Sequence, residues 1–75
     1  MIQFSKHSLI KLGQRKIGRN FVIATLENPD YTQESSGGRT IAFKKFRTLY
    51  MKVIFKRKTN STVVITQYWV RKIKI

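Results

Sequence analysis

The chain has 75 residues, of which 16 are Lys or Arg and three are Asp or Glu, so its net charge is +13. This length suits a single domain, residues 1–75, and a 41% hydrophobic content with nine aromatic side chains argues against disorder. The chain has no Cys, which excludes disulfides and thiolate zinc sites. It has one His and three acids, so few side chains remain that could bind a metal ion. No apolar run approaches the ~20 residues of a membrane span, and the first residues lack a signal-peptide core. We therefore expect a cytoplasmic, strongly basic domain with no cofactor, no bound metal and no membrane partner.

The first third of the sequence predicts two helices. Ser5 is a favourable N-cap, so a helix is expected to begin at the next residue and to end before Gly18. A second helix is expected from residue 19 or 20 to residue 26. Pro29 stops it, because proline cannot continue a helix and restrains the residue before it.

The rest of the sequence predicts antiparallel strands. Residues 49–56 alternate between two faces, which is typical of a half-buried strand, and residues 62–70 are rich in β-branched and aromatic side chains. The turn signals between the apolar segments predict strands at residues 31–34, 39–46, 49–56 and 62–70. The fold class expected is α+β, with two N-terminal helices packed on a three- or four-stranded antiparallel sheet.

Tyr68 and Trp69 point to opposite faces of the last predicted strand, so one of them is expected in the core. If Trp69 continues the face of Val63 and Ile65, it is the core member. Tyr68 would then share the other face with Thr66, beside a cleft.

The distribution of charge indicates a polyanionic partner. All three acids lie between residues 27 and 34, whereas residues 35–75 carry eleven bases and no acid. Such a field attracts polyanions and speeds their encounter. Nucleic acid is the usual intracellular polyanion, with an anionic membrane surface as the lesser alternative.

Metal-independent RNA cleavage is compatible with this inventory of side chains. The RNA 2′-OH is the nucleophile in that reaction, so the enzyme needs a proton acceptor, a proton donor and cations around the phosphate. His7, Lys11 and Arg15 are four residues apart and share one face of the first predicted helix. Tyr68 is a further candidate for proton transfer. The alternative interpretation is that Lys11 and Arg15 form a solvated face while His7 packs near the helix start.

A second group of bases is interleaved with aromatic residues and is a candidate for contacts with RNA phosphates and bases. Its members are Arg39, Lys44, Lys45 and Arg47. The alternative places the neighbouring aromatic residues in the core and the bases in solvent, and we favour that alternative for Phe43 and Phe55.

Several motifs in order resemble a small bacterial and archaeal family of domains of unknown function. They are Phe4-Ser5-Lys6-His7, Lys11, Arg15, Ile17, Leu26-Glu27-Asn28-Pro29-Asp30, the strand at residues 51–56 and the strand at residues 63–68. Family members typically carry Ala, Arg and Gly where this chain has Ser8, Lys11 and Lys16. The resemblance covers nearly the whole chain.

That family looks related to the RelE/ParE-like toxins within the barnase, colicin and RelE nuclease superfamily. The resemblance implies a RelE-like α+β fold, endoribonuclease activity and neutralisation by an acidic antitoxin protein, with His7 and then Arg15 as catalytic candidates. The RNA partner could be free or ribosome-bound mRNA. Two alternatives stay open, namely a non-catalytic nucleic-acid-binding module and a ParE-like inhibitor that acts by protein contact.

Overall fold

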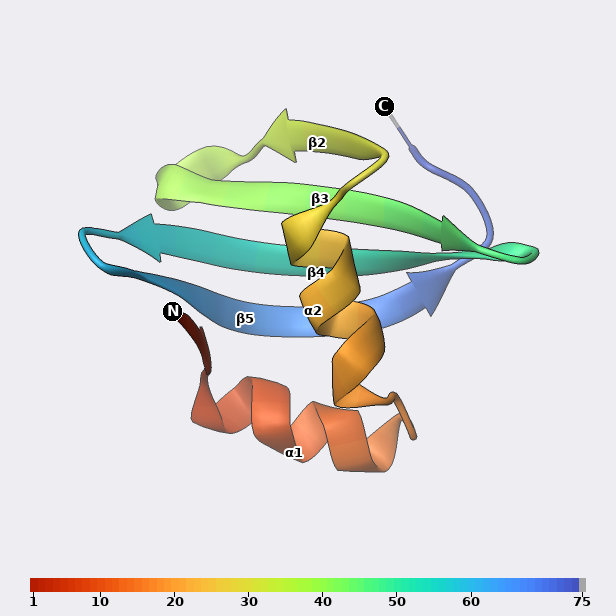
Figure 1. Cartoon of the computed structure of the whole chain (residues 1–75), viewed down its shortest axis with the longest axis horizontal. Helices are drawn as coiled ribbons and strands as arrows, with labels where there is room; N and C mark the ends of the chain where they lie inside the picture. The colour runs from red at the N-terminus through yellow and green to blue at the C-terminus, as the bar shows by residue number, and fades with distance from the viewer. Residues whose placement is uncertain (75) are drawn as a thin grey trace.

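The computed structural model describes residues 1–74, which form two α-helices, a short 3₁₀ turn (Ser36–Gly38) and one five-stranded sheet. The strands are β1 (Ile2–Phe4), β2 (Tyr31–Glu34), β3 (Arg39–Phe46), β4 (Leu49–Lys58) and β5 (Ser61–Val70), and the helices are α1 (Lys6–Gln14) and α2 (Arg19–Glu27). The strand order across the sheet is β1-β5-β4-β3-β2. Strands β2 to β5 form an antiparallel meander, and β1 pairs in parallel with β5 (Figure 1).

The predicted α+β class is confirmed, but the expected strand number and the all-antiparallel arrangement are wrong. The additional strand β1 lies parallel to β5, with Gln3 opposite Val63. Three residues are too short to show the two-residue alternation by which a strand is recognised, and the pairing partner lies about 60 positions away in sequence.

Both ends of α1 are fixed by local hydrogen bonds. The Ser5 hydroxyl accepts from the Ser8 backbone N–H at 3.0 Å, which confirms Ser5 as the N-cap. At the other end the Lys16 N–H donates to the Gly13 carbonyl (3.3 Å) and the Ile17 N–H to the Leu12 carbonyl (2.9 Å). This is a Schellman turn, and Lys16 occupies its left-handed position with a φ of 53°. The helix therefore ends before Gly18, which is instead the N-cap of α2.

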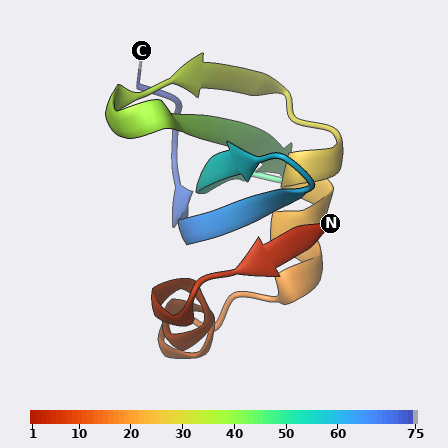
Figure 2. The ribbon, with the colours of Figure 1, turned by 90° about the vertical axis from the view of Figure 1, so that its left-hand side faces the viewer.

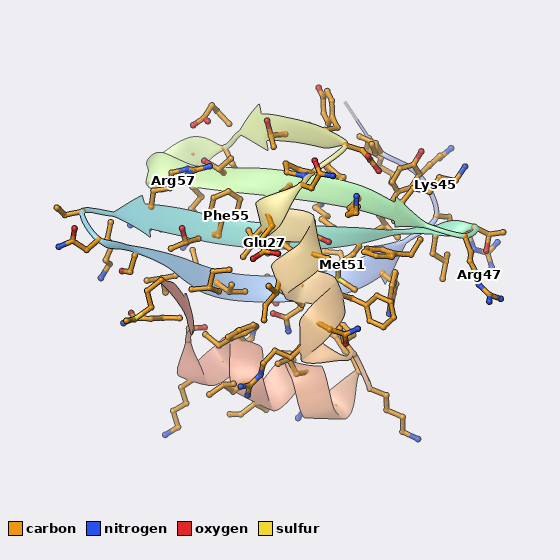
Figure 3. The ribbon with its side chains drawn as sticks, viewed as in Figure 1. Glu27, Lys45, Arg47, Met51, Phe55 and Arg57 are labelled. Carbon is orange, nitrogen blue, oxygen red and sulfur yellow. The ribbon has the colours of Figure 1, made fainter. Side chains whose placement is uncertain are left out.

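Helix α2 covers one face of the sheet, over β3 and β4 (Figure 1). It buries Val22 and Thr25 against the sheet, where Met51, Val53 and Val64 are fully buried. Each such apolar side chain contributes about 1.5–3 kcal/mol when it leaves water. Trp69 packs on this core beside Phe21, with ring centroids 5.3 Å apart. Met51 and Phe55 lie on either side of α2 in Figure 3, and both belong to the core.

Trp69 is on the core face as expected, but not with Val63 and Ile65. A β-bulge shifts the register of β4 and β5 between Ile54 and Phe55, so that Ile54 pairs with Thr66 and Phe55 with Val64. The extra residue exchanges the faces on either side of it. Val64, Gln67 and Trp69 therefore share the core face.

Helix α1 lies along the edge of β5 rather than on a face of the sheet (Figure 2). It extends the edge protection that β1 begins. The Ser5 hydroxyl donates to the Ile65 carbonyl (3.2 Å), and the Arg15 Nη1 donates to the Gln67 carbonyl (2.8 Å). Ser8 and Gln67, both fully buried, join α1 to β5 through two hydrogen bonds between them. Leaving one of these buried groups unpaired would cost about 1–3 kcal/mol, so this pair fixes the position of α1 against the strand.

The second face of the sheet carries no helix, and we call it the open face. The strand registers place on it Tyr31 and Gln33 of β2, Arg39, Ile41, Phe43 and Lys45 of β3, Tyr50, Lys52 and Ile54 of β4, and Thr66, Tyr68 and Val70 of β5. Figure 2 shows α2 on one side of the sheet and the C-terminal segment on the other. The C-terminal tail, residues 71–74, therefore returns across the open face.

Candidate nucleic-acid interface

A row of aromatic and cationic side chains crosses the open face at right angles to the strands. Phe43, Lys52 and Tyr68 lie opposite one another on β3, β4 and β5, and Tyr31 pairs with Phe43 on β2. The Lys52 ammonium lies 5.8 Å from the centre of the Phe43 ring and 5.2 Å from that of Tyr68. The Arg15 guanidinium, beyond the edge of β5, lies 5.3 Å from the centre of the Tyr68 ring. Cations and rings at such distances attract each other.

A pocket of about 330 Å³ opens on this row. It is lined by Phe43, Lys52, Tyr68, Val70, Arg71, Lys72 and Lys74. Of these seven described residues four are cationic and none is acidic. The tail supplies three of the four cations, so the pocket lies between the sheet and the tail.

None of the three acids lines this pocket, and two of them make hydrogen bonds within the sheet. Asp30 accepts from the Lys45 backbone N–H at 2.8 Å, and its own N–H donates to the Phe43 carbonyl, also at 2.8 Å. Glu34 accepts from the Thr40 hydroxyl at 3.4 Å at the β2 edge of the sheet. Glu27 is exposed at the end of α2 (Figure 3). The positive field of the open face is therefore little compensated.

Two of the four predicted catalytic residues, Arg15 and Tyr68, are brought together. Arg15 is held by the Gln67 carbonyl and by the Thr66 hydroxyl at 3.2 Å, with its guanidinium beside the Tyr68 ring. Tyr68 shares its face with Thr66 and lines the pocket, as the sequence predicts.

The other two predicted catalytic residues, His7 and Lys11, lie further along α1. Lys11 donates to the Gln14 side chain at 2.9 Å. His7 is exposed, and its imidazole makes no hydrogen bond within residues 1–74. It lies two turns from Arg15, roughly 12 Å along the helix axis. The Arg15 side chain reaches Gln67, which also contacts Ser8, the neighbour of His7. Among the described residues, no hydrogen bond joins the His7 side chain to Arg15 or Tyr68.

The predicted phosphate-binding group Arg39, Lys44, Lys45 and Arg47 does not form one cluster. Lys44 points to the helical side, where its ammonium donates to the Asn28 carbonyl at 3.1 Å, whereas Lys45 lies on the open face over the Tyr50 ring. Adjacent residues of a strand point to opposite faces, so proximity in sequence separates these two lysines. Arg39 pairs with Lys56 at the far end of β3, and Arg47 lies in the β3–β4 turn (Figure 3).

Lys52 and the bases of the tail line the site but were not predicted from the sequence as its members. Lys52 falls on the polar face of residues 49–56, and its cross-strand position between two rings depends on the register of three strands. Phe43 is buried as expected, at 2% exposure, but it lies on the open face and outside the main core.

Other kinds of site receive no support from the described residues. Within residues 1–74 no three side chains of His, Asp or Glu are grouped to hold a metal ion. Over the same residues, neither helix is long and apolar enough to cross a membrane. Neither protein-family models, nor curated proteins, nor solved structures give a match to this chain.

Proposed function

We propose that this protein is a toxin-type endoribonuclease that binds RNA on the open face and cleaves it without a metal ion. The observation that carries the proposal is the position of Tyr68, which lines a basic pocket while the cations of Arg15 and Lys52 lie 5.3 and 5.2 Å from its ring centre. A proton-transferring hydroxyl among phosphate-binding cations is what this reaction requires of an enzyme.

The proposed chemistry balances with side chains of this chain alone. His7 takes the proton of the RNA 2′-OH, and the 2′-oxygen forms a bond to the adjacent phosphorus. The bond from phosphorus to the 5′-oxygen breaks, and that oxygen takes the proton of the Tyr68 hydroxyl. Arg15 and Lys52 stabilise the charge on the phosphate oxygens, where a guanidinium can donate two hydrogen bonds. The products are a 2′,3′-cyclic phosphate and a 5′-hydroxyl, and both side chains then exchange protons with water.

The toxin part of the proposal rests on the family resemblance, and the end of α1 is compatible with it. Lys16 has a φ of 53°, in the left-handed region that glycine enters without steric cost. The resembled family carries Gly at this position. A glycine at this position would favour the same turn, although in this chain a lysine adopts it.

We expect the purified protein to cleave single-stranded RNA in the presence of excess EDTA. The chain offers too few ligands to hold a catalytic metal, so a chelator should not lower the rate. The measurement is gel analysis of an end-labelled RNA, with mass spectrometry of the fragments. Fragments ending in 2′,3′-cyclic or 3′-phosphate support the proposal, whereas intact RNA with and without ribosomes contradicts it.

An acidic protein partner is the second part of the proposal. A basic open face with its acids elsewhere repels itself, and an acidic antitoxin would relieve that repulsion and cover the pocket. Expression of this chain alone should arrest growth, and co-expression with an acidic neighbouring gene product should restore growth and yield a co-purifying complex. Normal growth at high expression, with unchanged translation and replication, would count against a toxin.

A non-catalytic RNA-binding module is the second candidate. The observation in its favour is that His7 is exposed, with no hydrogen bond within residues 1–74 to orient its imidazole. A general base usually accepts its proton from a defined position within hydrogen-bond distance. Strong RNA binding without cleavage under any condition would select this candidate.

A further inference from the structure

The C-terminal tail covers an aromatic side chain that no helix covers. Phe43 lies on the open face yet is only 2% exposed. The Lys52 ammonium lies 5.8 Å from its ring centre, and Arg71, Lys72 and Lys74 line the same pocket. Figures 1 and 2 show the tail leaving the end of β5 and crossing the sheet on the side opposite α2. The tail therefore forms one wall of the pocket and the sheet forms the other.

We propose that this pocket binds one unpaired nucleotide of a single-stranded RNA, with the base against Tyr68 and the flanking phosphates between Lys52 and the tail. This inference rests on the proposed RNA-binding function and specifies the form of RNA that the site takes. It also gives the tail a role as a clamp over the bound strand.

The chemistry of the lining favours a ligand that is both aromatic and anionic. Four cations surround a pocket with an aromatic floor, and no acid among the lining residues offsets their mutual repulsion. A nucleotide presents a flat ring to Tyr68 and a negatively charged phosphate to the four cationic side chains. Stacking on an aromatic ring tolerates any base, whereas cations hold the backbone.

The shape of the site favours an unpaired base over a duplex. In a duplex the bases are stacked and paired, so their flat surfaces cannot reach a side-chain ring. A pocket of about 330 Å³ between a sheet and a strand of backbone can admit one splayed base but not the width of a paired helix. A duplex could contact the tail cations only from outside.

The test compares short single-stranded and double-stranded RNAs that carry 2′-O-methyl groups, so that no cleavage occurs during the measurement. We expect the wild type to bind the single strand more tightly. Tyr68→Ala should weaken single-strand binding roughly 5- to 150-fold, the range of one lost base stack. It should change duplex binding little. Tyr68→Phe keeps the ring and should bind like the wild type. If Tyr68→Ala folds poorly, Tyr68→Leu takes its place in the test. Leucine keeps an apolar side chain but has no ring, so this variant should also bind the single strand more weakly than the wild type.

The tail is tested with a charge-matched pair of triple variants. Arg71→Gln with Lys72→Gln and Lys74→Gln should lower the salt dependence of single-strand binding by about two units of log–log slope. This triple variant should also reduce the ratio of single-strand affinity to duplex affinity. Lys56→Gln with Arg57→Gln and Lys58→Gln removes equal charge from exposed residues at the far end of β4 and should leave that preference intact (Figure 3).

The outcomes separate this inference from the function on which it rests. Equal affinity for single strand and duplex, or Tyr68→Ala binding like the wild type, would overturn the nucleotide pocket while leaving RNA binding in place. Equal effects of the two triple variants on the single-strand preference would overturn the clamp. Absence of salt-dependent binding to either RNA would instead overturn the proposed function.

Discussion

His7→Ala should lower the rate of RNA cleavage roughly 10²- to 10⁴-fold, which is the usual contribution of a general acid or base. Imidazole is the side chain that both takes and gives a proton near neutral pH, and His7 is the single His of the chain. RNA affinity should change little, because the substitution removes at most one charge from a large excess. Single-turnover cleavage and separate binding titrations would measure the two effects.

Two further variants test whether the loss of cleavage is specific to His7. Arg15→Ala should lower both cleavage and affinity, because the guanidinium beside Tyr68 can hold a phosphate before and during the reaction. Lys6→Ala, which changes the exposed neighbour of His7 on α1, is the matched control and should leave the cleavage rate within a few fold of wild type. If His7→Ala cleaves like Lys6→Ala, the catalytic assignment of His7 is wrong.

The local structure of this protein can be predicted well from its sequence because short-range rules determine it. Ser5 caps α1, and Pro29 follows the end of α2. The alternation of residues 49–56 places Met51 and Val53 in the core. Each of these results depends on neighbours within a few residues.

Features that depend on distant pairing were not predicted. β1 is identified only by its partner β5, and the bulge opposite Ile54 and Phe55 decides which side chains of β5 face the core. An extra residue in a strand leaves no mark on the alternation of types, since Val63, Val64 and Ile65 are all β-branched and apolar.

The candidate site shows the same division between local and distant information. Arg15 and Tyr68 were selected for their chemistry, and the docking of α1 on β5 brings them together. Lys52 joins them through the register of β4 and β5. The bases of the tail were not predicted as members of the site, because nothing in their sequence indicates that the chain folds back across the open face.

RNA affinity should fall steeply as salt rises, because cations of the protein that neutralise phosphates release condensed counterions from the RNA. Six bases lie around the row and the pocket, namely Arg15, Lys45, Lys52, Arg71, Lys72 and Lys74. Six phosphate contacts on a single strand correspond to a log–log slope of about −4, so a fourfold rise in salt should weaken binding on the order of 10²-fold.

Titration of a fluorescent, cleavage-resistant RNA across a salt series measures this slope. A slope near −4 agrees with contacts confined to the open face, whereas a much steeper slope would require the bases of α1 and of the β4–β5 turn as well. Lys52→Gln should reduce the slope by less than one unit, since a single phosphate contact on a single strand contributes about 0.7. If RNA affinity does not change with salt concentration, RNA phosphates are not bound by the basic side chains. That result would contradict both the nuclease and the RNA-binding module.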